Sequence, residues 1–141
     1  MPLVQGVLTA FLSLLCVSCL APQNTAMVAV DMRGWSEPAT ILFENEDTLS
    51  LRSLDISIRY NREFAESKLP LKLKVLSPDG RFFEESLTFT LKRPYRASVV
   101  SVSESVPYRA DVTLAMKGTY IFVFEPHSEI EGVEAIGVEI K

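Results

Sequence analysis

Residues 69–91 read LPLKLKVLSPDGRFFEESLTFTL, and this stretch decides the fold of the chain. Leucine and valine alternate with proline and lysine as far as residue 75, and a second apolar alternation resumes at residue 83. Because successive side chains of a β-strand point to opposite faces, each arm presents one apolar face and one polar face. In the second arm the expected apolar row is Phe83, Leu87, Phe89 and Leu91, and the expected wet face is Glu84, Glu85, Ser86, Thr88 and Thr90.

The two arms are joined by Ser77-Pro78-Asp79-Gly80, which has the composition of a tight turn. Pro78 presets the φ angle of the second turn position, Asp79 can hydrogen-bond to its own backbone, and Gly80 supplies a positive φ. The stretch therefore predicts a β-hairpin whose register is fixed at its tip. An isolated hairpin is only marginally stable, so the flanking segments must supply a second layer.

Length and composition indicate one globular domain. The chain has 141 residues, of which 48% are hydrophobic and 23% are charged, enough for a single domain with a real core. The net charge is −4, and lysine and arginine are scattered along the chain and form no stripe. This charge pattern argues against a nucleic-acid-binding protein.

Strand patterns recur along the rest of the chain at intervals of about ten residues, and no segment has the period of an amphipathic helix. The segment 49–60 changes the parity of its apolar positions between Leu51 and Leu54, which predicts a β-bulge near residues 52–53. Segment 119–125 is apolar on both sides and is expected in the middle of a sheet. The pattern predicts an all-β antiparallel β-sandwich, jelly-roll or Ig-like, and a closed barrel is the alternative. About nine short strands are expected, over residues 27–32, 39–44, 49–60, 69–75, 83–91, 95–102, 106–116, 119–125 and 133–140.

The N-terminal segment has the composition of a targeting sequence. Residues 1–30 carry no charged side chain, and the apolar run at residues 7–20 is too short and too early for a comfortable membrane span. We therefore expect a signal peptide over residues 1–18.

The only cysteines, Cys16 and Cys19, lie at the end of this apolar run. The sequence Cys16-Val17-Ser18-Cys19 resembles a bacterial lipobox, in which a small residue precedes the cysteine that is acylated and becomes the new N-terminus. This pattern predicts a lipid anchor at Cys19, a tether at residues 19–26 and a β-sandwich domain at residues 27–141. The alternatives are a secretory peptide cut near Ala21 or Ala26, and a disulfide between the two cysteines.

The sequence offers little catalytic chemistry. His127 is the only histidine and lacks the further ligands of a metal site, so we interpret it as a solvated loop residue. Asp79 is explained by the turn, and Glu84 and Glu85 by a wet strand face, rather than as a glycosidase pair. The serines at 98–105 have no histidine partner, and the six glycines form no phosphate-binding loop. We expect no catalytic, cofactor-binding or metal-binding residue and no enzymatic activity.

Three aromatic residues remain as candidates for a partner surface. Trp35, Tyr95 and Tyr108 lie at the borders of expected strands, where their rings could face a protein or a sugar. The alternative for Trp35 is that it caps one end of the core, as large rings are usually mostly buried.

Several segments resemble the gliding-motility lipoprotein family GldH of the Bacteroidetes. They are residues 58–61 (IRYN), 64–69 (FAESKL), the Ser-Pro-Asp-Gly turn, 118–122 (GTYIF) and 131–140 (EGVEAIGVEI). The chain departs from the family between residues 82 and 106, where members carry a Trp-Leu-Gly segment with further glycines. The resemblance covers most of the expected domain, and its C-terminal part is the most specific.

The resemblance implies a small cell-envelope lipoprotein associated with gliding motility and linked to type IX secretion, with no known enzymatic activity. Members also occur in bacteria that do not glide, which implies a more general role in secretion or envelope assembly. Two classes of function follow: a lipoprotein that docks onto other envelope proteins, and a glycan-binding sandwich. Residues 20–30 contain no acidic residue, which favours a lipid-anchored, periplasm-facing protein of the first class. We expect the membrane and other envelope proteins as partners, and neither nucleic acid nor a small-molecule ligand.

Overall fold

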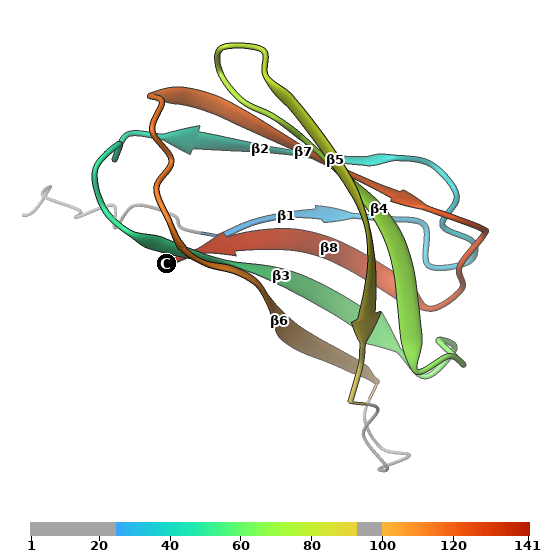
Figure 1. Ribbon diagram of the computed structural model, residues 1–141. Helices are drawn as coiled ribbons and strands as arrows, with labels where there is room; N and C mark the ends of the chain where they lie inside the picture. The colour runs from blue at the N-terminus through green and yellow to red at the C-terminus, as the bar shows by residue number, and fades with distance from the viewer. Residues whose placement is uncertain (1–24, 93–99) are drawn as a thin grey trace, which may run out of the picture.

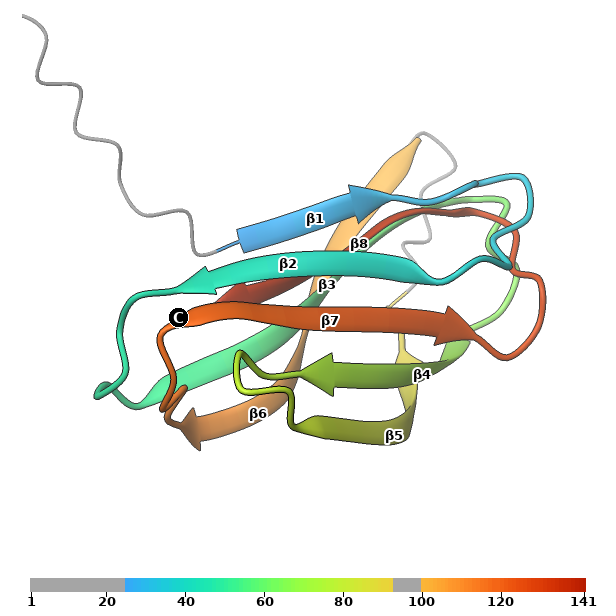
Figure 2. The same ribbon diagram turned by 90° about the horizontal axis from the view of Figure 1, so that it is seen from above.

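The computed structural model describes residues 25–92 and 100–141, and these fold into two β-sheets packed face to face (Figures 1 and 2). Every pairing between neighbouring strands is antiparallel, and each sheet has four strands. The predicted all-β antiparallel sandwich is therefore confirmed. The strands are β1 (Thr25–Ala29), β2 (Ala39–Asn45), β3 (Arg52–Asn61), β4 (Lys68–Leu76), β5 (Phe82–Thr90), β6 (Ser101–Val112), β7 (Gly118–Pro126) and β8 (Val133–Ile140).

The strand order is that of a jelly roll. The first sheet has the order β1-β8-β3-β6 and the second has the order β2-β7-β4-β5. Each of the first four strands thus pairs with its counterpart on the way back, β1 with β8, β2 with β7, β3 with β6 and β4 with β5. The chain is one long hairpin wound so that successive pairs fall in alternate sheets, which distinguishes it from the Ig-like and barrel alternatives.

The hairpin of β4 and β5 joins the first four strands of the jelly roll to the last four. Its register pairs Leu71 with Leu87. In the turn, the backbone N–H of Gly80 donates to the oxygen of Ser77 at 2.9 Å, and Gly80 has a φ of 85°. The carboxylate of Asp79 accepts the backbone N–H of Arg81 at 3.2 Å. The predicted hairpin and the predicted roles of Asp79 and Gly80 are confirmed.

Alternation fills the core from both sheets. The inward side chains of β3, β4, β7 and β8 are almost fully buried. The central position predicted for residues 119–125 is confirmed, because β7 lies between β2 and β4. The outward side chains of β7 are only partly covered. The largest fully buried side chains are Trp35, Phe122, Phe124, Ile56, Ile58, Leu69, Leu71, Leu73, Ile136, Ile140, Val133 and Val138.

The described residues form eight strands where about nine were predicted. The difference arises at β6. One strand was expected to end at residue 102 and the next to begin at residue 106, but β6 continues without interruption through residues 102–106. Pro107 does not interrupt it, because β6 lies at the edge of its sheet and one side of its backbone needs no partner. Its serines 101, 103 and 105 follow one strand face. Residues 93–99, part of the other predicted strand, lie outside the described residues.

A bulge occurs at the predicted position near residues 52–53, but the predicted strand is wrong, because the bulge lies in β6 and not in β3. The register of β3 against β6 shifts between Arg52 and Asp55, but the additional residues belong to β6, where Asp111 has a φ of 54°. The parity change in the sequence has another cause: Leu49 and Leu51 precede β3 and are 89% and 70% exposed. They belong to a loop and do not continue the apolar face of the strand.

The sandwich has two distinct ends (Figure 2). We call the end at which β1 begins the proximal end and the opposite end the distal end. At the proximal end Thr25, the first residue of β1, pairs with Glu139 near the C-terminus. The β2–β3 loop, the β4–β5 turn and the β6–β7 loop also lie at the proximal end. There Asn45 Nδ2 donates to the backbone oxygens of Leu114 and Met116 at 2.9 and 2.8 Å, which fixes the β6–β7 loop. The distal end is formed by the β1–β2, β3–β4 and β7–β8 loops.

Candidate functional site

Trp35 lies in the core. Its side chain is 2% exposed, and its indole Nε1 donates to the backbone oxygen of Glu37 at 2.7 Å. Its backbone pairs with that of Ile130 through hydrogen bonds of 2.8 and 3.0 Å. The predicted partner-surface role of Trp35 is therefore wrong, because a ring packed in the core cannot face a protein or a sugar. The alternative, that Trp35 caps one end of the core, is confirmed.

Tyr108 links the two sheets. It is half-buried on the inner face of β6, and its hydroxyl donates to the carboxylate of Glu85 on β5. Arg109 Nη2 reaches the two oxygens of the same carboxylate at 2.9 and 3.0 Å, and its guanidinium lies 4.7 Å from the centroid of the Tyr108 ring. Burial and the hydrogen bond to Glu85 raise the pKa of Tyr108. The expectation that Glu85 lies on the wet face is wrong, because Glu85 shares the inward parity of Leu87 and faces this tyrosine.

The other two residues singled out in the sequence, Tyr95 and Cys19, lie outside the described residues. The same is true of the expected signal peptide and of the expected tether as far as residue 24. Residues 25 and 26, assigned to the tether, belong to β1, where Ala26 pairs with Val138.

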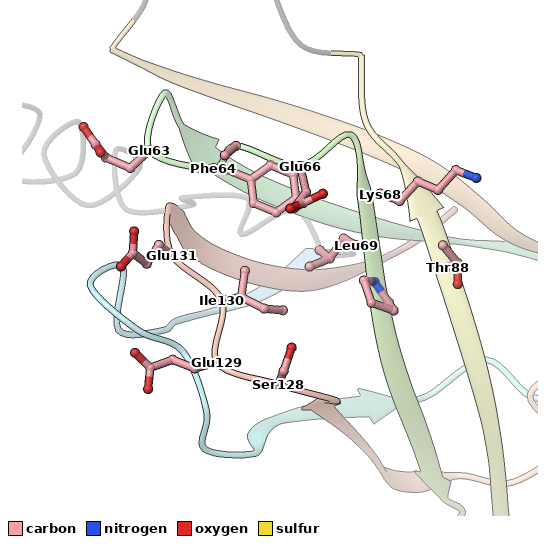
Figure 3. A pocket seen from close by; sticks show the side chains of 12 residues that line it. Glu63, Phe64, Glu66, Lys68, Leu69, Thr88, Ser128, Glu129, Ile130 and Glu131 are labelled. Carbon is pink, nitrogen blue, oxygen red and sulfur yellow. The ribbon is translucent and has the colours of Figure 1, made fainter.

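An open pocket of about 570 Å³ lies at the distal end, between the β3–β4 loop, the β7–β8 loop and the start of β4 (Figure 3). Its floor is apolar, since Phe64 and Leu69 are 2% and 0% exposed and Ile130 is partly buried. Figure 3 shows these three side chains around the hollow, with Lys68 directed away from it. The pocket thus combines a fixed apolar floor with a solvent-exposed mouth.

Gly132 holds the loops of this end together. Its N–H donates to the backbone oxygen of Met32 in the β1–β2 loop at 2.9 Å, and its oxygen accepts the N–H of Asn61 at 2.8 Å. Gly132 has a φ of 87°, and a Cβ at this position would lie 2.1 Å from the backbone nitrogen of Phe64. Asn61 in turn accepts the N–H of Glu63 on its side-chain oxygen at 2.9 Å. The pocket wall is therefore fixed by backbone contacts that only glycine permits.

The mouth of the pocket is rich in glutamate, although Lys68 also lines the pocket and Arg33 lines a second hollow with Glu63 and Glu131. Glu63, Glu66, Glu129 and Glu131 line the mouth, all four are exposed, and none makes a side-chain ion pair or hydrogen bond within the described residues. Elsewhere in the described chain most carboxylates are engaged, with distances such as 2.8 Å from Lys74 to Glu125 and 3.1 Å from Lys141 to Asp55. Unpaired like charges around an apolar floor suit a partner segment that brings a lysine or arginine beside an apolar side chain.

No local sequence motif predicts this pocket. Residues 63–70 and 128–131 are distant in the sequence, and only the jelly-roll topology brings them together. His127, which the sequence indicated as a solvated loop residue, is exposed and does not line the pocket. Within residues 25–92 and 100–141, no group of three histidine, cysteine, aspartate or glutamate residues is placed to hold a metal ion. The arrangement is an apolar floor with an acidic mouth.

Comparisons with known proteins add no assignment. The described part of the chain includes no helix that is long and apolar enough to cross a membrane. No protein-family model matches the sequence, and no curated protein matches it.

Proposed function

We propose that this protein is a non-enzymatic lipoprotein of the cell envelope that acts by docking onto other envelope proteins. The observation that carries the docking function is the distal pocket, in which the apolar floor of Phe64, Leu69 and Ile130 is surrounded by four unpaired glutamates. A polar rim around an apolar centre is the usual composition of a protein–protein contact. The charge favours a partner with a basic segment.

The envelope assignment rests on the sequence. The apolar leader ends in the lipobox-like Cys16-Val17-Ser18-Cys19, and an acyl chain on Cys19 would tether the domain to a membrane. The resemblance to the GldH family adds the process: association with gliding motility or with the type IX secretion machinery. The lack of acidic residues in residues 20–30 supports a periplasm-facing position.

The glycan-binding alternative is weaker for a specific reason. Sugar-binding sites use exposed aromatic rings as platforms, but Trp35 is buried and the hydroxyl of Tyr108 is engaged by Glu85. Neither ring is presented as a platform, and the exposed rings of Phe82 and Phe83 lie at the opposite end of the sandwich from the pocket, so we prefer the protein-docking function.

The test is a pull-down of the tagged full chain from crosslinked cells. The double variant Glu129→Gln and Glu131→Gln removes two charges from the pocket mouth, and the matched control Glu46→Gln and Glu84→Gln removes two from elsewhere on the surface. We expect wild type and control to recover the same envelope protein, and recovery with the pocket variant to fall about tenfold, the equivalent of about 1.4 kcal/mol. Equal recovery with all three proteins would contradict docking at this pocket.

A further inference from the structure

Exposed apolar side chains gather at the proximal end of the sandwich. Leu49 and Leu51 in the β2–β3 loop are 89% and 70% exposed, and Phe82 and Phe83 beside the β4–β5 turn are 61% and 49% exposed. Eight large apolar side chains are exposed in the described chain. The four named above lie at the proximal end, Met27 and Leu42 lie within β1 and β2, Met32 lies in the β1–β2 loop, and Val100 directly precedes β6. The β2–β3 loop and the first residues of β5 thus place exposed apolar side chains at the end of the sandwich where β1 begins.

The charges at this end are largely paired. Arg52 lies 3.8 Å from Asp47, Arg81 lies 3.0 Å from Asp79, and the Lys117 ammonium lies 3.2 Å from Glu46. Such pairs leave little net field, so the chemistry that distinguishes this end is apolar exposure.

The length of the tether determines what this end faces, and this step rests on the proposed acyl anchor at Cys19. Five residues lie between Cys19 and Thr25, and the six residue-to-residue steps of a fully extended chain span at most about 22 Å. A strand of nine residues, such as β4, is about 30 Å long. The tether is therefore too short for the domain to stand on its distal end, and it keeps the start of β1 within about 22 Å of the bilayer.

We propose that the proximal end rests on the lipid bilayer, with Leu49, Leu51 and Phe82 inserted into the interfacial layer. The acyl chains supply the anchor, and these side chains fix the orientation of the domain on the membrane. The distal pocket then points away from the bilayer, toward partners in the periplasm.

The experiment uses the acylated full chain, purified and reconstituted in neutral phosphatidylcholine vesicles. Single-cysteine variants Leu49→Cys, Phe82→Cys and, as the distal control, Ser128→Cys receive an environment-sensitive fluorophore. Acylation consumes the thiol of Cys19, and cleavage removes Cys16, so the introduced cysteine is the only free thiol. All three positions are solvent-exposed, so labelling leaves the core intact. We expect a shift to shorter emission wavelength and quenching by lipid-borne quenchers at positions 49 and 82, and neither at position 128.

Three outcomes would overturn the inference. In the first outcome, the protein floats with the vesicles but its emission spectra are equal at all three positions. This result would retain the acyl anchor and contradict the contact of the proximal end with the membrane. A wavelength shift that persists in detergent and grows with protein concentration assigns the face to a second copy of the chain. Wild-type protein that does not float with vesicles contradicts the acyl anchor and this inference together, while the pull-down result for the distal pocket still stands.

Discussion

At the scale of single residues, Gly132 has the largest structural consequence for the proposed docking site. It joins the β1–β2, β3–β4 and β7–β8 loops through the hydrogen bonds to Met32 and Asn61, and the backbone of Phe64 packs against its α-carbon. The positive φ and the close approach both require the absence of a side chain. The floor and the wall of the pocket depend on this position.

We expect Gly132→Ala to lower the free energy of unfolding by about 2–3 kcal/mol, because strain at the positive φ is added to a clash with backbone atoms. The matched control is Gly80→Ala, which has a similar φ of 85° but no heavy atom within 4 Å of the added Cβ. The control should cost only about 1 kcal/mol. Urea unfolding followed by circular dichroism measures both, and equal losses would show that the contact with Phe64 is unimportant.

At the scale of elements, the edge strands β5 and β6 each carry a carboxylate on the inner face. Glu85 on β5 bonds to Tyr108, and Glu104 on β6 accepts the hydroxyl of Tyr60 and, on both oxygens at 3.0 Å, the backbone N–H of Lys92. These bonds close the side of the sandwich where the two edge strands meet. Inward charges on edge strands also discourage pairing with another chain.

The link between Tyr108 and Glu85 makes stability sensitive to alkaline pH. The pKa of Tyr108 is raised above its ordinary value of 10.0, first by burial and then by the bond to Glu85. Because the folded state holds this proton more tightly, the stabilisation is complete below the unfolded pKa and is lost as the pH rises above it. Between about pH 9 and pH 11, wild type should lose on the order of 1 kcal/mol more than Tyr108→Phe, after allowance for partial solvent screening.

Urea unfolding of both proteins at each pH measures this difference, and the titration of lysines and of the other tyrosines cancels in the comparison. Arg109→Lys is a useful companion variant, because it retains the charge near Glu85 but loses the planar guanidinium that lies 4.7 Å from the centroid of the Tyr108 ring. Parallel pH profiles for wild type and Tyr108→Phe would show that Tyr108 does not hold its proton in the folded protein.

At the scale of the whole molecule, the two ends of the jelly roll have different chemistry. The proximal end combines the start of β1 with exposed leucines and phenylalanines, and the distal end carries the apolar-floored pocket with its glutamates. The proposed tether at one end and the proposed docking pocket at the other would suit a protein that holds a partner at a fixed distance from a membrane.

The anchor predicts a simple difference between the two cysteines. Cys19→Ala should abolish acylation and leave an uncleaved precursor or a freely soluble protein, whereas Cys16→Ala should be tolerated, because only Cys19 follows the small Ser18. Stable anchoring requires at least two acyl chains, each buried methylene contributing about 0.8 kcal/mol. Metabolic labelling with a palmitate analogue, followed by membrane fractionation, measures the effect. Equal labelling and membrane retention in wild type and Cys19→Ala would refute the lipoprotein assignment.

The sequence by itself determined the local structure of this protein. Period-two alternation identified the strands, Pro78, Asp79 and Gly80 defined the hairpin turn, and apolar residues on both sides placed β7 inside a sheet. These features depend on neighbours in the sequence, on steric limits to φ and on the alternating faces of a strand, so they can be read before the chain is folded.

Only the tertiary structure decided the topology and the candidate site. The sequence predicted a wet-face position for Glu85, and only the opposing Tyr108 on the other sheet explains its inward position. The pocket glutamates come from loops that the sequence keeps far apart, and Trp35 was a surface candidate until its contacts with Ile130 were known. The physical reason is that burial and charge compensation depend on contacts between distant segments, which no local pattern specifies.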